Sequence, residues 1–438
     1  MRKLIVVVIS TMLLALVIVG NSYAKKKELT ILWTSPFQAK VIKTMAADYS
    51  EKFDVDVKVD VVSWEDVVPK VSALKAAGNP PELGYIISGQ GWTFYQNGWL
   101  NPLTEVVEFL GGDNYFMPSP GYQKVQGEYW LIPVGTMPLK ITYRKDLFEQ
   151  KGLKEPTTWD DILKAAKALT EDLDGDGKID RYGISFCASR TYCLSVWFMS
   201  ILWANGGYIL DEGGNVVFDS PATIEALKFI KELAQYAPPG IAEYSWENNV
   251  DTFAANKVAM TEYSELRVIK VTNERNPAIA AASDVAEIPV GPSGQESRNR
   301  WTTMHWMSFK GSKNPEEAKR FVEWFMQPSR LINYYHGVAE AGSISAPAEK
   351  LVLQSEKLWT HPLYQKFGSV VKKYSTFSKH SINPVIEHPG KITPVVPVFM
   401  QDMTITDAVQ EVLYGGASPE AAASKAAKKM RKYMKKHK

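Results

Sequence analysis

The most informative side chains form an acidic run in the middle of the chain. Acidic residues occupy its first, third, fifth and ninth positions and glycine its sixth, the spacing by which a loop wraps a hard cation such as Ca²⁺. The predicted metal-binding residues are Asp172, Asp174, Asp176, Lys178 and Asp180. The twelfth position, where such loops place a bidentate glutamate, is Gly183. We expect a structural calcium site; a metal-free acidic turn and a regulatory calcium switch are the alternatives.

The remaining reactive groups predict no catalytic site. The two cysteines, Cys187 and Cys193, would close a small loop in an oxidising compartment, and the alternative is two unlinked thiols. The sequence contains no Gly-x-Ser-x-Gly elbow, no His-Glu-x-x-His and no phosphate-binding glycine loop. Among 48 acidic residues no segment singles out a carboxylate pair. We therefore expect a protein that is not an enzyme.

Aromatic and polar residues near the ends of predicted strands are the candidates for binding a small ligand. A sugar ring offers an apolar face and a rim of hydroxyls, so its site combines flat aromatic rings with hydrogen-bonding groups. Several of the 13 tryptophans follow strands, where α/β sheets place ligands. The predicted ligand-binding residues are Trp33, Gln38, Trp64, Gln90, Trp92, Thr136, Arg190, Trp246, Glu262, Tyr263, Trp301, Trp306 and Glu340. The alternatives are core packing for the aromatic residues and solvated surface for the charged ones.

Alternating strands and helices must position these residues. Short apolar or period-two runs predict strands, and runs with apolar residues at helical spacing predict helices between them. The first three predicted strands are Leu29–Trp33, Val55–Val61 and Leu83–Ile87. This alternation predicts an α/β fold with a mostly parallel sheet covered by helices.

Cap residues followed by proline mark the starts of later helices, at Ser220-Pro221, Asn314-Pro315 and Ser418-Pro419. A chain of 438 residues predicts two or more domains, and no internal repeat or low-complexity linker divides it. We therefore expect two interleaved domains.

Residues 1–24 have the three parts of a secretory signal peptide. Arg2 and Lys3 form the basic start, an apolar run reaches Val19, and a small-x-small cleavage pattern ends at Ala24. We expect cleavage near Ala24 and residence in the periplasm; an uncleaved membrane anchor is the alternative. The segment carries two positive charges and no negative ones, so its removal takes the formal net charge from +2 to zero. A neutral protein has no global field that attracts nucleic acid.

Seven segments, in order and at ordinary spacing, together resemble one protein family. They are Gly127–Thr136, Tyr143–Leu153, Pro156–Trp159, the acidic loop with Asp180–Ile184, Trp203–Gly207, Phe253–Met260 and Lys313–Ala318. From about residue 28 to the C-terminus the chain resembles the extracellular solute-binding proteins of sugar-type ABC importers, the group that includes maltose-binding protein. After Met260 that family usually has Gly-x-Trp, whereas this chain has Glu262-Tyr-Ser-Glu265, which puts the identity of the solute in doubt.

The resemblance implies the type II periplasmic-binding-protein fold, with two interleaved α/β lobes joined by hinge crossovers. It places residues 25–138 plus about 305–345 in the first lobe and residues 139–304 plus about 346–438 in the second. The protein would be a monomer whose lobes close on a sugar or oligosaccharide, and an ABC transporter permease would read the closed form.

Three other functions stay open. A glycoside hydrolase would need two carboxylates facing each other across a sugar bond. The same fold could bind a non-sugar small polar solute, such as a cyclitol, a phosphodiester or an oligopeptide. It could also bind ferric iron, because Tyr334-Tyr335-His336 offers the adjacent tyrosines that ferric-binding relatives use.

Overall fold

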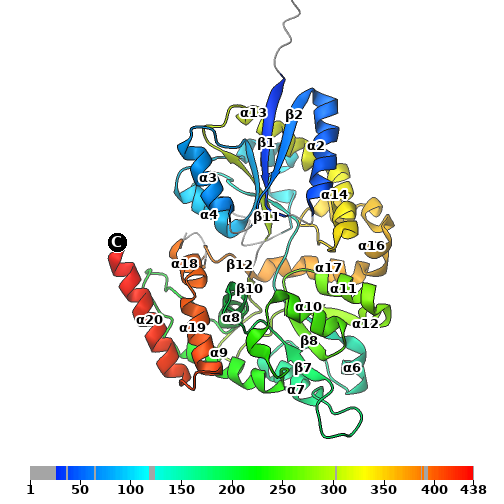
Figure 1. The fold of residues 1–438 in the computed structure, drawn as a ribbon, viewed down its shortest axis with the longest axis vertical. Coiled ribbons are helices and arrows are strands. Elements are labelled where there is room, and N and C mark those ends of the chain that lie inside the picture. The colour runs from blue at the N-terminus through cyan, green and yellow to red at the C-terminus, as the bar shows by residue number, and fades with distance from the viewer. Residues whose placement is uncertain are drawn as a thin grey trace, which may run out of the picture.

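The protein has two α/β lobes, each built around its own β-sheet and one above the other in Figure 1. The computed structural model describes residues 26–35, 38–63, 66–117, 124–300, 303–385, 387–388 and 393–437. In these ranges no helix is long and apolar enough to cross a bilayer. The predicted signal peptide lies outside them. The two α/β lobes agree with the predicted fold class.

The first lobe contains a sheet with the strand order β2-β1-β3-β11-β4, and β5 also pairs with β11. Its strands are β1 (Lys27–Trp33), β2 (Val55–Val61), β3 (Leu83–Ile87), β4 (Leu100–Asn101), β5 (Ile132–Val134) and β11 (Met304–Phe309). β1 pairs in parallel with β2 and β3, as the alternation of strands and helices predicted. β11 returns from far along the sequence and pairs antiparallel with β3, so the two lobes are interleaved.

Helices cover this sheet because each has an apolar face to bury. In α2 that face contains Ile42, Met45 and Tyr49, at the three- and four-residue spacing of a helix. The helices of the first lobe are α2 (Ala39–Phe53), α3 (Val67–Ala76), α4 (Ser88–Gln96), α5 (Thr104–Leu110), η2 (Gly112–Asn114), α13 (Pro315–Phe325), α14 (Pro328–Ala341), α15 (Lys350–Gln354), η5 (Glu356–Thr360) and α16 (Pro362–Lys366).

The second lobe contains a mixed sheet with the strand order β7-β8-β6-β9. Its strands are β6 (Lys140–Arg144), β7 (Tyr182–Ser185), β8 (Val258–Tyr263) and β9 (Ser283–Ala286). Its helices are α6 (Lys145–Gln150), α7 (Trp159–Ala168), α8 (Tyr192–Ala204), α9 (Pro221–Leu233), η3 (Ala234–Tyr236), η4 (Ile241–Glu243), α10 (Trp246–Ala254), α11 (Arg267–Arg275), α12 (Pro277–Ala281), α17 (Gly368–Thr376), η6 (Phe377–His380), α18 (Val395–Gln401), α19 (Thr404–Leu413) and α20 (Pro419–Lys436). The helix α8 is buried along almost its whole length and forms the centre of this lobe.

The predicted helix starts are found in the structure. Ser220 and Ser418 each accept a hydrogen bond from a backbone N–H in the first turn, and a proline follows each at the first helical position. Asn314 also precedes a helix that begins with proline, but its side chain makes no cap hydrogen bond. It donates instead to Glu28 O, which ties the start of α13 to β1.

The chain segments that pass between the lobes run side by side. The backbone N–H of Leu139, in the first crossover between β5 and β6, donates to Arg300 O, in the second crossover between β9 and β11, over 3.2 Å. The hydroxyl of Thr303 donates to Val134 O and Gly135 O at 2.8 and 2.9 Å. Gly135 has a φ of +72°, which a residue with a side chain rarely adopts. A two-residue ladder between β10 (Asn299–Arg300) and β12 (Ser381–Ile382) adds a third segment to this bundle.

The elements after residue 345 pack between the two sheets. α15, η5 and α16 contribute Val352, Leu358 and Tyr364 to the same core as Tyr335 of α14. That core also contains Tyr374 of α17, a helix that packs against β9 of the second lobe. The division of the chain between the lobes near residue 346 stays a prediction.

Candidate functional site

The second lobe contacts the first just beyond the end of β8. Ser343, after α14, donates its hydroxyl to Glu265 Oε2 at 3.1 Å. Tyr374 of α17 donates to the carbonyl of Pro138, in the first crossover, at 2.8 Å, and also to Ser264 O. The loop after β8, the crossovers and the end of α14 therefore meet at one place, which we call the lobe boundary.

Lys140 lies beneath this loop and is fully buried. Its ammonium donates to Glu265 O at 2.7 Å and to Tyr263 O at 3.3 Å, and lies 5.2 Å from the centre of the Tyr374 ring. Burial lowers the pKa of Lys140 to about 7, although Glu262 and Glu265 oppose this shift. Lys140 therefore holds the turn after β8 against the start of β6 mainly through carbonyl oxygens.

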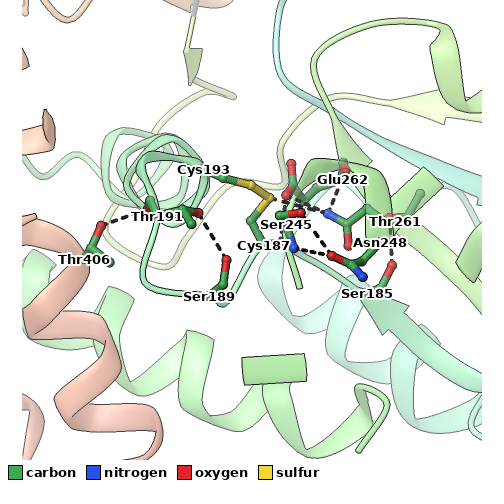
Figure 2. The surroundings of a disulfide bond; sticks show 11 residues. Ser185, Cys187, Ser189, Thr191, Cys193, Ser245, Asn248, Thr261, Glu262 and Thr406 are labelled. Atoms are coloured by element: carbon green, nitrogen blue, oxygen red, sulfur yellow. Dashed lines mark hydrogen bonds between the residues drawn. A yellow bond between two sulfur atoms is a disulfide. The ribbon is translucent and has the colours of Figure 1, made fainter. Parts of the chain in front are cut away.

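Glu262 points from β8 toward the disulfide (Figure 2) and is fully buried. Its Oε1 accepts the backbone N–H of Cys187 at 2.9 Å and the Asn249 amide at 3.0 Å. Its Oε2 is buried and has no hydrogen-bond partner among the described residues. Burial raises the pKa of Glu262 to about 7, and the bonds from Cys187 and the charge of Lys140 limit the rise. A carboxyl group that is partly protonated near neutral pH thus lies under the ends of β7 and β8.

Cys187 and Cys193 form a disulfide, with Cα atoms 5.7 Å apart. The bond joins the segment after β7 to the first turn of α8 and closes the loop between them. Inside this loop the hydroxyls of Ser189 and Thr191 lie 3.1 Å apart, and Thr406 donates to Thr191 O at 3.2 Å. The sequence left this pairing open, because spacing alone does not show that the two Cβ atoms approach each other.

Arg300 lies at the second crossover, beside the first turn of α8. Its guanidinium is 6% exposed and donates through Nη2 to the Tyr192 hydroxyl at 3.0 Å. The guanidinium carbon lies 5.5 Å from the centre of the Tyr192 ring, and Nε is buried without a hydrogen-bond partner in the described part of the chain. Arg300 is not among the predicted ligand-binding residues, although it directly precedes Trp301, which is.

The aromatic residues predicted for the first lobe are packed into its core. Trp33 is fully buried, stacks on Tyr85 with ring centroids 3.8 Å apart, and donates its indole N–H to Ser35 O at 2.8 Å. Trp306 is also fully buried, 5.9 Å from Trp33, and Trp92 is 3% exposed. This corrects the expectation that these three rings face a ligand. They lie on inward-facing positions of β1, β11 and α4, where a large ring contributes most to burial.

Gln38, a predicted ligand-binding residue of the first lobe, is connected to this core by hydrogen bonds between side chains. The Tyr334 hydroxyl donates to Gln38 Oε1 at 2.9 Å and lies 2.6 Å from the Tyr85 hydroxyl. Tyr335 donates to Glu349 at 2.7 Å, and His336 Nε2 lies 2.9 Å from Leu358 O. The two tyrosine hydroxyls thus have separate structural partners, so they do not form the paired ferric ligands of the iron hypothesis.

The other predicted ligand residues lie in different places. Arg190 is exposed and forms a bidentate ion pair with Asp407 of α19, at 2.7 and 3.2 Å. Glu340 is exposed on α14 and lines a groove of about 370 Å³ between α2 and α14. Gln90 is half-buried in α4. Thr136 is buried in the first crossover, where its Oγ1 has no partner among the described residues.

Trp246 and Tyr263 do lie together, with ring centroids 5.5 Å apart, edge to face. Trp246 begins α10 and is half-buried, and Tyr263 ends β8 beside Glu262. Trp64 and Trp301 lie outside the described residues. The structure therefore gathers Trp246, Glu262 and Tyr263 on the second lobe but does not bring Arg190 or Glu340 to them.

The segment after β12 reaches from one lobe to the other. Val385 packs with Leu32 and Trp92 in a core of the first lobe. Two residues later, the buried Glu387 accepts the indole N–H of Trp203 in α8 at 2.9 Å. Burial raises the pKa of Glu387, and hydrogen bonds from Ile209, Trp203 and Leu210 oppose the rise. The sequence does not indicate this connection, because no pattern distinguishes Val385 and Glu387 from other residues.

The acidic loop is on the surface of the second lobe, and its carboxylates converge. Ligand oxygens of Asp172, Asp174 and Asp176 all lie within 4.8 Å of one another. Asp172 accepts backbone N–H groups of Gly175 and Gly177 at 2.7 and 2.8 Å, and these bonds lower its pKa, that from Gly177 most. Such oxygens suit Ca²⁺, so the donor set fits the predicted metal.

The remaining two predicted loop residues are placed differently. Asp180 accepts the backbone N–H of Leu173 at 2.8 Å, which closes the loop. Lys178 is exposed, and its ammonium lies 3.3 Å from Asp176 Oδ2. Lys178 therefore has only its backbone carbonyl to offer a cation.

Comparison with known proteins gives consistent relatives. Residues 32–329 match the family described as "Bacterial extracellular solute-binding protein". A putative binding protein of Brucella abortus is 28% identical over 303 residues, 67% of this chain and 69% of its own. The mannitol-binding protein of Pseudomonas aeruginosa is 25% identical over 280 residues, 59% of this chain and 62% of its own.

Solved structures share the fold. Maltose-bound MalE3 of T. maritima superposes with a TM-score of 0.73 at 21% identity, covering 92% of this chain and 99% of that one. A Thermotoga lettingae solute-binding protein of an ABC transporter, bound to alpha-D-tagatose, gives a TM-score of 0.71 at 25% identity, with 93% and 99% covered.

Proposed function

The chain belongs to the bacterial extracellular solute-binding protein family, and from this we propose that it captures a sugar or oligosaccharide between its lobes for an ABC transporter permease. The observation that carries the proposal is the pair of α/β lobes joined by adjacent crossovers at the lobe boundary. Relatives named for mannitol and maltodextrin, and similar structures bound to maltose and tagatose, support a sugar.

Binding would act by population shift. A solute that contacts both lobes favours the closed state by the difference between its affinities for the two states. The permease would then recognise the closed form. No bond in the solute is made or broken, because the relatives are binding proteins and the sequence singles out no carboxylate pair.

Two further proposals concern location and metal. Residues 1–24 would direct the chain to the periplasm, where a released receptor stays near its permease. The loop of Asp172, Asp174, Asp176 and Asp180, with the carbonyl of Lys178, would bind Ca²⁺ and stabilise the second lobe without taking part in solute binding.

A thermal-shift screen against mono- and oligosaccharides tests the main proposal. A solute at about 100 times its Kd stabilises the folded protein by roughly 2.7 kcal/mol, which raises Tm by several degrees. Chromatography of the same mixtures checks for released product. A protein that no sugar stabilises, or that cleaves an oligosaccharide, would contradict the proposal.

A further inference from the structure

Among the described residues, Arg300 carries a buried positive charge without a negative partner. Three arginines are buried among the described residues: Arg144, Arg181 and Arg300, which are 8%, 7% and 6% exposed. Arg144 pairs with Asp146 and Arg181 with Glu171. No carboxylate of a described residue lies within 4.0 Å of the Arg300 guanidinium, which donates only to the hydroxyl of Tyr192.

The acidic residues near Arg300 in the sequence have other partners. Glu296, four residues before it, pairs with Arg298. Glu287 lies 2.7 Å from His380. Glu65 is the only acidic residue of the chain outside the described ranges. The missing counter-charge is therefore not found in the neighbouring sequence.

An arginine does not escape this situation by losing its proton, because a guanidinium stays protonated in proteins. A buried charge is costly unless it is paired and hydrogen-bonded. The cation–π contact with Tyr192 offsets only part of that cost. A binding protein that keeps such a group has a use for it when an anion arrives.

The position of Arg300 connects it to the solute. Its backbone carbonyl accepts from Leu139 of the first crossover, and its backbone N–H donates to Ser200 of α8 at 2.9 Å. Its guanidinium reaches the first turn of α8, directly after the loop closed by the disulfide. The two crossovers and the first turn of α8 therefore meet at Arg300.

The surrounding donors favour an oxyanion. No described residue accepts a hydrogen bond from the buried Nε, which leaves an N–H of the guanidinium fork for a ligand oxygen. The helix α8 has 13 residues and its N-cap, Thr191, makes no side-chain cap hydrogen bond. The Leu194 N–H donates to Thr191 O at 3.2 Å, and the positive end of the helix dipole adds to the attraction for a negative group.

We infer that the solute is an acidic sugar, whose carboxylate or phosphate group is held by Arg300 at the lobe boundary. This inference rests on the proposed function, because it assumes that a solute binds between the lobes. It adds a charge requirement: a neutral sugar of the same shape leaves the guanidinium unpaired and binds more weakly.

Isothermal titration with matched sugars tests the inference. The pairs are glucose with glucuronate and galactose with galacturonate, each as the monomer and as the corresponding disaccharide, and glucose 6-phosphate separates phosphate from carboxylate. We expect an acidic sugar to bind at least tenfold tighter than its neutral counterpart. Arg300→Gln should reduce its affinity roughly ten- to hundredfold, the range for a hydrogen bond to a charged group. Arg300→Lys should recover part of it.

Three further measurements keep the result unambiguous. Arg300→Met should raise the Tm of the free protein, because it removes an unpaired charge, whereas Arg181→Met should lower it, because Glu171 loses a partner. Glu65→Gln should leave the affinity unchanged; a gain in affinity for the acidic sugar would identify Glu65 as the partner whose removal frees the guanidinium, and would overturn the inference.

The possible failures are distinguishable. If neutral sugars bind and Arg300→Gln binds them as the wild type does, with no preference for acids, the acidic-sugar inference is wrong and the proposed function stands. If no sugar of either kind binds, both are wrong. An Arg300→Met protein that fails to fold would give the guanidinium a structural role and would also overturn the inference.

Discussion

Glu262→Gln should make the protein more stable above neutral pH and leave it nearly unchanged in acid. Glu262 is fully buried, and its Oε1 already accepts two hydrogen bonds, from Cys187 and Asn249. Glutamine keeps an oxygen for both donors and has no charge. It therefore resembles the protonated form of the residue, so the substitution removes the ionisation and little else.

The size of this gain in stability follows from the pKa of Glu262, which is about 7 in the folded protein against an ordinary value of 4.5. The folded state holds its proton more tightly than the unfolded state, so stability falls as pH rises between these two values. Below about pH 4.5 both states are protonated and Glu262 contributes nothing. Above pH 7 the full penalty applies, which is about 3 kcal/mol at about 1.4 kcal/mol per pKa unit.

Urea unfolding of both proteins from pH 4.5 to 8 measures this difference. The advantage of the glutamine variant should grow from near zero to about 3 kcal/mol across the range. Glu232→Gln, an exposed position on α9, is the matched control and should show a flat difference. A flat difference for Glu262→Gln as well, or a loss of stability at pH 8, would refute the reasoning about its burial.

Three other perturbations test separate parts of the structure. Replacing both Cys187 and Cys193 by serine should lower the free energy of unfolding in urea by about 2 kcal/mol, because the disulfide closes a seven-residue loop in the unfolded chain. Reducing the disulfide of the wild type should lower it by the same amount. An unchanged unfolding midpoint would contradict this. Ser343→Ala removes the hydrogen bond to Glu265, so the closed state should lose about 1 kcal/mol of stability. Solute affinity should then fall roughly fivefold, and small-angle scattering should show a larger radius of gyration. Values identical to those of the wild type would show that this contact does not favour closure. Chelating calcium, or Asp172→Asn, should lower Tm while the folded protein keeps its solute affinity; a loss of binding with the fold intact would make the metal functional instead of structural.

The fold was predictable because its signals are local and repeated. Each strand of the first lobe that the sequence indicated, such as Val55–Val61 with its period of two, is a strand in the structure. Ser220 and Ser418 mark helix starts by their own chemistry. The return of β11 and the position of α15 and α16 depend on which faces remain uncovered after earlier elements have packed. That information is not local, so the sequence does not specify it.

The ligand residues were harder to predict, because residue type does not show whether an aromatic ring at the end of a strand packs into the core or faces a ligand. Trp33 and Trp306 have the composition of a sugar platform, yet they lie on inward positions and stabilise the core. Glu262 was selected for its charge, and the structure adds its complete burial, which raises its pKa to about 7.

The buried arginines show most clearly what a sequence omits. Arg181 follows Asp180 but pairs with Glu171, and Glu296 lies close to Arg300 in sequence but pairs with Arg298. Charge partners are thus decided by packing, and the absence of a partner is a property of the whole fold. The described carboxylates near Arg300 pair with other groups, so the guanidinium at the crossovers lacks a partner among them. From this we infer that the solute supplies the negative group. A receptor that accepts only neutral sugars has no use for such a charge, because Arg300→Met would give it the same shape at a lower cost of desolvation.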